Sequence, residues 1–309
     1  MANIAITGAT GLVGSHLSNR FSEMGHTVFA LVKDENSKSF LSKGVTRIYG
    51  DIGNRRDTEY FVQKSNPNYF IHLAAQTQAY DSLKYPYQTF YNNVVGTLNV
   101  LESLREFSLC EAVIVASSDK AYGELKTEFY TESHELRGIY PYDASKSATD
   151  LIANSYRETY KMPIAITRAC NIYGVGDYNR QRLIPGIVAA HKEQSKFKIR
   201  NKGADLREYI NVDDVVDAYI KIVGYILSTN QESSFNISSG DRKSTLEVFK
   251  LVEQTIGCAI PVEIAQEEGL EIKKQFMNSS LLEDCTGWSP KHTLATTINE
   301  TVDWYLKHL

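Results

Sequence analysis

The sequence lacks the features of membrane-spanning and nucleic-acid-binding proteins. Its longest apolar runs, residues 28–32 and 112–116, are far shorter than the about 20 residues of a transmembrane helix. Its 33 Lys and Arg residues do not outnumber its 37 Asp and Glu residues, and the net charge of −4 does not suit a phosphate backbone. No basic leader or apolar signal segment precedes residues 4–7. We therefore expect a cytoplasmic protein with no membrane or nucleic-acid partner.

Cysteine is scarce, and its spacing excludes several architectures. The four cysteines are far apart in the sequence and include no CxxC pair: Cys110, Cys170, Cys258 and Cys285. Such spacing is typical of reduced thiols rather than of a disulfide framework or a zinc site. The seven histidines show no metal-ligand spacing, so we expect no bound metal.

Short apolar runs alternate with segments of helical periodicity along the chain. Continuous apolar runs predict strands at residues 4–7, 27–32, 46–49, 69–73, 112–117 and 164–168. Helices are predicted between them at residues 12–24, 57–64, 89–107 and 144–160. This alternation predicts an α/β fold with a Rossmann-like, doubly wound parallel sheet.

The pattern changes after about residue 168, where loops lengthen and elements shorten. A capping box at residues 244–247 begins a further helix, and a turn at 287–290 precedes the last one. We expect a dinucleotide-binding domain of residues 1–170 plus about 206–232. A smaller C-terminal substrate lobe, residues 171–205 and 233–309, would lie over the carboxyl ends of the strands.

Glycines in a GxxGxxG pattern follow the first predicted strand and open the first helix. They allow a tight turn and a close approach of the backbone to a pyrophosphate, which the helix N-terminus would bind. The alternative is an ordinary strand–helix turn. The expected cofactor-binding residues here are Gly8, Thr10, Gly11, Leu12 and Gly14.

The end of the second strand bears on the choice between NAD and NADP. Val32 stands where an NAD enzyme carries the acid that binds the ribose 2′-OH, and Lys33 can instead meet a 2′-phosphate. This slightly favours NADP over NAD; the alternative is a solvated Lys33 with Asp34 on the ribose. Asp51 and Ile52, after the third strand, are expected near the adenine.

Tyr142 and Lys146 are four residues apart on a predicted helix, so their side chains share one face. An ammonium group beside a tyrosine lowers the phenol pKa, and the phenolate can then accept a proton from a sugar hydroxyl. The alternative is an exposed helix pair.

Polar residues follow the apolar run 112–116, at the sheet edge where active sites of this architecture form. We expect Ser118 to hydrogen bond the reacting oxygen beside Tyr142. Asp119 and Lys120 would add an acid and a possible base. The alternative is a solvated turn.

These motifs together resemble the extended short-chain dehydrogenase/reductase family, which contains the nucleotide-sugar epimerases and dehydratases. The resemblance rests on residues 7–14, 72–75, Asn93 with Gly96 and Thr97, and residues 117–123, 142–146, 168–174, 207–214 and 287–290. It implies a nucleotide-sugar substrate, NAD or NADP as cofactor, and a homodimer formed through the helices 89–107 and 144–160. The cofactor-binding residues that it adds are Leu73, Ala74, Ala75, Tyr142 and Lys146.

Within that family, the tripeptide Ser118-Asp119-Lys120 resembles the variant of CDP-glucose 4,6-dehydratases. Asp177 and residues 183–185 also fit that branch. Arg207 is followed by Glu-Tyr where those enzymes carry Pro-Trp, so UDP-, GDP- and dTDP-sugars remain open.

The resemblance implies a mechanism of oxidation, water loss and hydride return. Tyr142 would take the proton of the sugar 4-hydroxyl while hydride leaves C4 for the nicotinamide. Lys120 would take the C5 proton, or only orient the substrate, and Asp119 would protonate the departing 6-hydroxyl. The hydride would then return to C6, giving a 4-keto-6-deoxy sugar.

The same resemblance suggests the residues on the substrate side, which are Gln76, Asn93, Asn171, Arg182, Leu183 and Arg207. Arg207 suits a diphosphate because its planar fork binds two oxygens, but a surface salt bridge with Glu208 is the alternative. Asn93 is expected to brace the helix near Tyr142. The competing functions are a 4-epimerase or 4-keto reductase on the same scaffold, and a non-catalytic dinucleotide-sensing protein.

Overall fold

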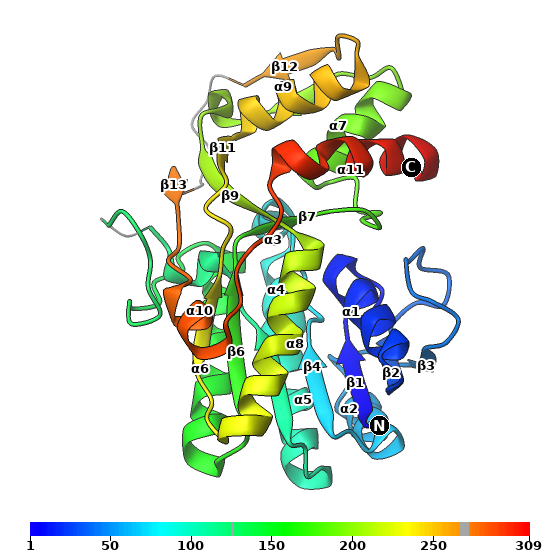
Figure 1. Ribbon diagram of the computed structural model, residues 1–309, viewed down its shortest axis with the longest axis vertical. Coiled ribbons are helices and arrows are strands. Elements are labelled where there is room, and N and C mark those ends of the chain that lie inside the picture. Colours follow the sequence, from blue (N-terminus) through cyan, green and yellow to red (C-terminus); the bar gives the residue numbers. More distant parts are fainter. Residues whose placement is uncertain (125–126, 266–271) are drawn as a thin grey trace.

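A seven-stranded parallel sheet forms the centre of the molecule in the computed structural model, which describes residues 1–124, 127–265 and 272–309 (Figure 1). The strand order is β10-β6-β5-β4-β1-β2-β3, and every neighbouring pair is parallel. The strands are β1 (Asn3–Thr7), β2 (Thr27–Val32), β3 (Thr46–Tyr49), β4 (Tyr69–His72), β5 (Ala112–Ala116), β6 (Ile164–Ala169) and β10 (Ser234–Ile237). The predicted doubly wound fold is confirmed.

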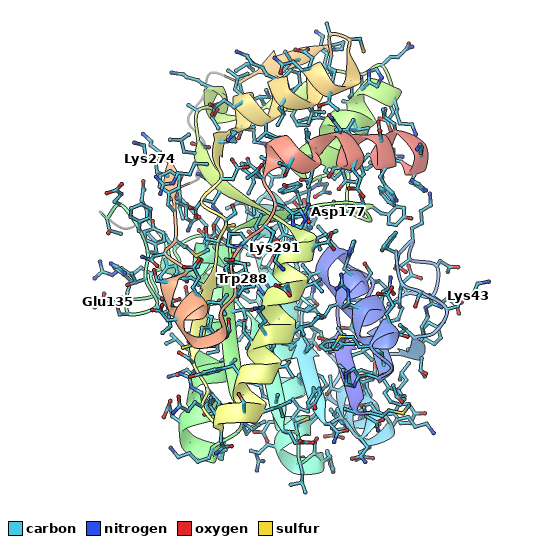
Figure 2. The ribbon with its side chains drawn as sticks, in the orientation of Figure 1. Lys43, Glu135, Asp177, Lys274, Trp288 and Lys291 are labelled. Carbon is cyan, nitrogen blue, oxygen red and sulfur yellow. The ribbon has the colours of Figure 1, made fainter. Side chains whose placement is uncertain are left out.

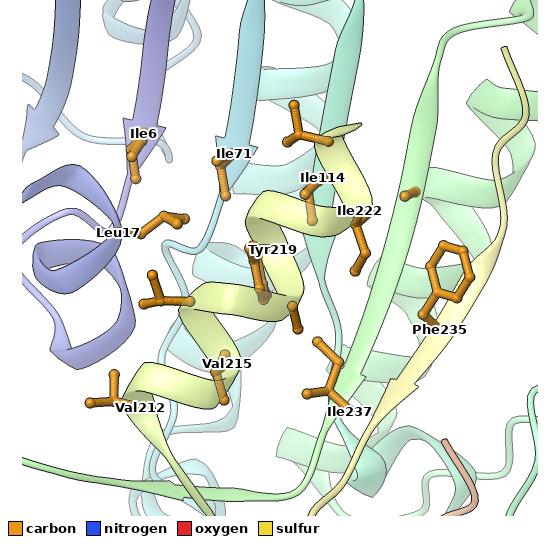
Figure 3. Close-up of a cluster of buried hydrophobic side chains, with 14 of the residues drawn as sticks. Ile6, Leu17, Ile71, Ile114, Val212, Val215, Tyr219, Ile222, Phe235 and Ile237 are labelled. Carbon is orange, nitrogen blue, oxygen red and sulfur yellow. The ribbon is translucent and has the colours of Figure 1, made fainter. Parts of the chain in front are cut away.

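Helices cover both faces of this sheet, because alternate strand residues are apolar on each side. On one face, α1 (Leu12–Glu23) and α8 (Val212–Thr229) enclose a core that contains Ile6 of β1 (Figure 3). On the other, α2 (Arg55–Ser65), α5 (Gly96–Phe107) and α6 (Pro141–Tyr160) enclose a core that contains Ala5. Successive residues of β1 therefore belong to different cores, as continuous apolar strands require.

The helix predicted at residues 89–107 is present as one uninterrupted helical run, but it contains a π turn that the sequence did not predict. The chain forms α3 (Ala79–Lys84) and α4 (Pro86–Phe90), then one turn of π-helix (Tyr91–Val95), and only then α5. The π turn carries the buried Asn93, whose amide is hydrogen bonded on two sides. Such turns often occur at functional sites.

The helix α6 begins at Pro141, three residues earlier than predicted. Proline suits the first helical position because its missing N–H would have no partner within the helix there. Tyr142 therefore lies in the first turn of α6, and its N–H donates to the Ser82 hydroxyl of α3 at 3.2 Å.

A smaller C-terminal lobe lies above the carboxyl ends of the large sheet (Figure 1). Its strands form two small sheets: β7 (Asn171–Tyr173), β9 (Leu206–Asn211), β11 (Arg242–Ser244) and β13 (Lys274–Gln275), and β8 (Phe197–Ile199) with β12 (Val262–Ile264). Its helices are α7 (Leu183–Lys192), α9 (Thr245–Ile256) and α11 (Leu294–His308), while α10 (Ser280–Thr286) lies beside β10. Ser244 and Glu247 form the predicted capping box of α9.

The domain boundaries drawn from the sequence stay a prediction. β10 follows the proposed boundary near residue 233, yet it is hydrogen bonded to β6 in the large sheet. In the part of the chain that the structure describes, no helix is long and apolar enough to cross a bilayer.

A buried ion pair fastens α6 to the sheet. The Nε and Nη2 atoms of Arg168, on β6, donate to the two carboxylate oxygens of Asp150 at 2.7 and 3.0 Å. The Nη1 atom of the same arginine donates to the Tyr122 hydroxyl at 2.8 Å. Arg168 is 5% exposed and Asp150 2%, so neither charge is solvated if its partner is removed.

We predict that Asp150→Ala lowers the free energy of unfolding by about 3–5 kcal/mol, because it leaves a buried guanidinium group without its carboxylate. Urea unfolding followed by circular dichroism would measure the change. Glu23→Ala is the control, since Glu23 pairs with Arg20 at the surface and such pairs contribute about 0–1 kcal/mol. An equal effect of the two substitutions would contradict the prediction.

Candidate active site

The loop between β1 and α1 has the close packing that a dinucleotide cradle needs. Gly8 has a φ of +69°, and a Cβ there would lie 2.7 Å from the amide nitrogen of Ala74. A Cβ on Gly14 would lie 2.2 Å from the carbonyl oxygen of Gly8. Gly11, at the N-cap of α1, has no side chain with which to cap the first N–H groups of the helix. The N–H groups are available to an anion, and the glycines let it come close to the backbone. Both features fit the pyrophosphate of a dinucleotide.

An ion pair lies after β2, where the sequence places the ribose of a dinucleotide. The Nζ atom of Lys33 lies 2.8 Å from Oδ2 of Asp51. Burial raises the pKa of Asp51, but the hydrogen bonds from Lys33 and from the Gly53 N–H outweigh it, and the pKa is lowered overall. Asp34 accepts a hydrogen bond from the Asn36 N–H at 2.9 Å, within its own turn. Lys33, although 68% exposed, is therefore paired rather than only solvated.

The loop after β4 is held against the glycine loop. The Ala74 N–H donates to the Thr7 hydroxyl at 3.3 Å, and the Gln76 N–H donates to Oδ1 of Asn93 at 2.7 Å. Asn93 returns a hydrogen bond from its amide to the Gln76 carbonyl oxygen at 3.0 Å. Leu73 and Ala74 thus lie beside Gly8, as a cofactor-binding segment would, and Ala75 follows them in the chain.

Ile52, which was expected near the adenine, packs into the core beside Gly96.

A buried polar chain connects β1 to the helix α6. His72 lies between the hydroxyls of Thr7 (2.7 Å) and Thr97 (3.1 Å). Thr97 donates to the carbonyl oxygen of Asn93, whose amide donates to Ser145 of α6 at 2.8 Å. The expected bracing role of Asn93 agrees with these contacts.

Tyr142 and Lys146 are both buried, and the Lys146 side chain reaches the end of β5. Burial raises the pKa of Tyr142 to about 12; a hydrogen bond with Ser118 and the charge of Arg182 oppose this, while Asp119 adds to it. Burial lowers the pKa of Lys146 to about 8. The Lys146 ammonium donates to the carbonyl oxygen of Ala116 at 2.8 Å. The Tyr142 pKa of the protein chain by itself is therefore raised overall, and the lowering effect expected of Lys146 stays a prediction.

The turn after β5 brings the other expected catalytic groups to the same place. Ser118 donates to Oδ1 of Asp119 at 2.9 Å, and its oxygen accepts the Lys120 N–H at 3.2 Å. Ser118 and Asp119 are 8% and 4% exposed, so this is not the solvated turn of the alternative interpretation. Both residues influence the pKa of Tyr142, which places the three side chains together.

Gln275 of β13 completes this cluster, although no sequence pattern indicated it. Its Oε1 accepts a hydrogen bond from the Lys120 ammonium at 2.8 Å, and its Nε2 donates to the Asp119 carbonyl oxygen at 2.6 Å. A glutamine in a two-residue strand carries no recognisable motif. Only the packing of the C-terminal lobe on the sheet edge brings it here.

The arginine expected to bind a diphosphate lies inside the protein. Arg207 on β9 is 6% exposed, so the alternative of a surface salt bridge is wrong. Its neighbour Glu208 accepts hydrogen bonds from the Ser238 hydroxyl and the Met277 N–H on the buried side. Asn171 donates to the Glu208 carbonyl oxygen at 3.2 Å.

Arg182 and Leu183 lie where α7 begins. Arg182 is the N-cap of α7 and donates to Asp177 at 3.0 Å; Figure 2 places Asp177 between the C-terminal lobe and the large sheet. The charge of Arg182 also lowers the pKa of Tyr142, so it faces the same site. Across the described ranges of the chain, no three His, Cys, Asp or Glu side chains come together as a metal site.

A glycine-lined cradle at the end of a parallel sheet, with a buried Tyr–Lys pair on the adjoining helix, defines a dinucleotide-dependent enzyme class. The chain belongs to the NAD dependent epimerase/dehydratase family, whose sequence profile matches residues 4–238.

Relatives and solved structures with several activities resemble the chain over nearly all of its length. It is 25% identical to the dTDP-glucose 4,6-dehydratase of Xanthomonas campestris, covering 99% of this chain and 93% of that protein. It is 23% identical to a trifunctional UDP-glucose 4,6-dehydratase/UDP-4-keto-6-deoxy-D-glucose 3,5-epimerase/UDP-4-keto-L-rhamnose-reductase of Arabidopsis thaliana, but spans only 47% of that protein. The structure of Thermus thermophilus UDP-glucose 4-epimerase in complex with NAD is also similar, with a TM-score of 0.90, 25% identity and 99% of both chains covered.

The burial of His72 predicts how the stability of the protein depends on pH. Burial, with a smaller effect of Lys146, lowers the His72 pKa from 6.5 to about 3. Between these values the unfolded chain binds a proton that the native protein does not, so stability falls as the pH falls through this window. The slope is about 1.4 kcal/mol per pH unit for one proton.

We expect His72→Gln to lose this acid sensitivity, so its unfolding free energy approaches that of the wild type as the pH decreases. Urea unfolding at a series of pH values would measure it. His308→Gln, at the exposed C-terminal end of α11, is the control. A constant difference between wild type and His72→Gln at all pH values would contradict the assignment.

Proposed function

We propose that this protein is a nucleotide-hexose 4,6-dehydratase. The observation that carries the proposal is the cluster at the end of β5, where Ser118 and Asp119 lie beside the buried Tyr142 and Lys120 belongs to the same turn. An elimination of water needs a base for the C5 proton and an acid for the 6-hydroxyl. Lys120 and Asp119 supply one group of each kind beside the phenol that would begin the oxidation.

Tyr142 would take the proton of the sugar 4-hydroxyl. A bound nicotinamide would accept the hydride from C4, return it later to C6, and add a positive charge that favours the phenolate. Ser118 and Arg182 already act to lower the Tyr142 pKa against the effect of burial. The Lys146 ammonium lies one helical turn from the phenol, where its charge would support the same ionisation.

Water loss would follow from the 4-ketone, which acidifies the C5 proton. Lys120, in its neutral form, would accept that proton. Asp119, in its protonated form, would give its proton to the departing 6-hydroxyl, so the two groups end with exchanged protonation states. The alternative, in which Lys120 only orients the substrate, predicts that C5 proton exchange survives its removal.

The nucleotide is the least constrained part of the proposal. The Ser118-Asp119-Lys120 sequence favours a CDP-glucose-type substrate, whereas the relatives named above act on dTDP- and UDP-sugars. Arg207 would bind the diphosphate in every case, so it does not select the base.

A cytoplasmic homodimer formed through α5 and α6 is part of the proposal too. Leu151 on α6 is 59% exposed, which suits a helix face that a partner covers.

A 4-epimerase is the second candidate, because a UDP-glucose 4-epimerase structure matches the chain with a TM-score of 0.90. An epimerase needs Tyr142 but has no elimination step for Asp119 and Lys120. A 4-keto reductase or a non-catalytic sensor would share the cofactor cradle.

We predict that the purified holoenzyme removes one water from a nucleotide hexose, and that Lys120→Met and Asp119→Asn reduce this by about 10²–10⁴-fold. Mass spectrometry after incubation with CDP-, UDP-, GDP- and dTDP-hexoses would measure the product. If the protein is an enzyme, Tyr142→Phe should reduce turnover by a similar factor. A non-catalytic sensor would keep its function after this substitution. Lys64→Met, at an exposed lysine on α2, is the matched control.

Epimerised product without water loss, or water loss unaffected by Lys120→Met and Asp119→Asn, would refute the dehydratase mechanism.

If Lys33 binds the 2′-phosphate of NADP, a substitution of Lys33 should change the cofactor preference of the protein. If Lys33 leaves Asp51 to bind a 2′-phosphate, Lys33→Glu should raise the KM for NADP by more than about tenfold and leave that for NAD nearly unchanged. Steady-state assays with each cofactor would measure this. Lys38→Glu, an exposed lysine of the same loop, is the control. Equal effects on both cofactors would rule out a role in 2′-phosphate recognition.

A further inference from the structure

Gln275 bridges two groups of the turn after β5 from the other lobe. It is 1% exposed, accepts a hydrogen bond from the Lys120 ammonium at 2.8 Å, and donates one to the Asp119 carbonyl oxygen at 2.6 Å. Lys120 and Gln275 are 155 residues apart in the sequence. The contact therefore exists only because the C-terminal lobe is seated on the sheet edge.

A side-chain amide suits both contacts. Its oxygen atom accepts hydrogen bonds and its nitrogen atom donates them. In the reversed orientation the NH₂ group would face the ammonium and the amide oxygen would face a carbonyl oxygen. The amide is also neutral, so it fixes the Lys120 amine without the negative charge that would stabilise the protonated form. A carboxylate in the same place would hold the lysine as an ammonium, which cannot accept a proton.

Gln275 is itself firmly anchored. In β13 it lies opposite Arg207 of the parallel strand β9. On its C-terminal side, the Met277 N–H donates to the buried Glu208 carboxylate at 2.9 Å, and the Tyr130 N–H donates to the Phe276 carbonyl oxygen at 2.9 Å. The amide therefore has a fixed position from which to orient a longer and more flexible lysine side chain.

We propose that Gln275 is a positioning residue for Lys120: it holds the amine in place for C5 deprotonation and adds no negative charge that would favour the ammonium form. This inference rests on the proposed dehydratase function. It assigns to the C-terminal lobe a part in the elimination step, in addition to substrate binding. Arg207, the expected diphosphate ligand, lies on β9, which is paired with the strand that carries Gln275.

The charged and titratable groups around this turn would be common to the wild type and its Gln275 variants. Asp119 acts on the pKa of Tyr142, Cys170 and Glu208. The elements that pack against the turn are α6, with Tyr142, Asp143, Lys146 and Asp150, and β6, with Arg168, while β9, paired with β13, adds Arg207 and Glu208. A change of pH profile on substitution of Gln275 would therefore be due to the new group at that position.

The decisive variant is Gln275→Glu. An opposite charge beside an amine raises its pKa by about 1–3 units, so elimination at neutral pH should fall by about tenfold to a thousandfold. Elimination should recover as the pH is raised. Oxidation at C4 should continue, so reduced nicotinamide should accumulate when the holoenzyme is mixed with substrate. Rapid-mixing absorbance, deuterium exchange at C5 and product formation would be followed together.

A second variant, Gln275→Met, keeps the side-chain length but removes both hydrogen bonds. We expect a lower kcat for elimination with little change in KM, and no recovery at high pH. Lys274→Gln is the matched control on the same strand, since Lys274 is exposed and lies at the outer edge of the molecule (Figure 2). It should keep the wild-type pH profile.

The outcomes separate this inference from the proposed function. If the wild type removes no water from any nucleotide hexose, the dehydratase proposal fails first. If the wild type does so, but Gln275→Glu shows an unchanged pH profile and no accumulation of reduced nicotinamide, the positioning role is wrong. A uniform loss of C4 oxidation and elimination in both variants would show a merely structural role and would also overturn it.

Discussion

The attachment of α6 to the parallel sheet is the constraint on which the rest of the structure depends. Buried contacts to the sheet include the Arg168–Asp150 ion pair and the Lys146 ammonium on the Ala116 carbonyl oxygen, and the Asn93 amide of the π turn holds Ser145 of the same helix. The contacts at Ser145 and Lys146 fix the turn next to Tyr142, and the contact at Asp150 fixes the following turn. Because Tyr142 lies in the first turn, these contacts determine where the phenol stands relative to the glycine loop and to the end of β5.

Burial then determines the electrostatics of the site. It raises the pKa of Tyr142 to about 12 and lowers that of Lys146 to about 8, so it favours the neutral form of both side chains. A phenol in this state is a weak base until positive charge is brought beside it. The chemistry that we propose thus couples proton removal to the presence of an oxidised, cationic nicotinamide, which would link deprotonation of the sugar to its oxidation.

The second half of the proposed reaction depends on the lobe junction rather than on α6. Lys120 extends from the turn after β5, and the amide that holds it comes from β13. A site divided in this way can change its chemistry through the C-terminal lobe while the sheet and the cofactor cradle stay the same. Dehydratases and epimerases among the structures and sequences that resemble this chain are consistent with such a division.

The sequence by itself determined the parallel sheet, the glycine loop and the Tyr142–Lys146 spacing, because these follow from local periodicity and from residues near each other in the chain. It could not determine the π turn at Asn93, the start of α6 at Pro141, or the ion pair of Lys33 with Asp51. It also suggested a lowered Tyr142 pKa, since helical spacing reports that two groups are neighbours but not how deeply they are buried. The contact of Gln275 with Lys120 was decided by tertiary structure alone. A contact between residues 155 positions apart depends on how two lobes pack, and it leaves no local pattern in the sequence.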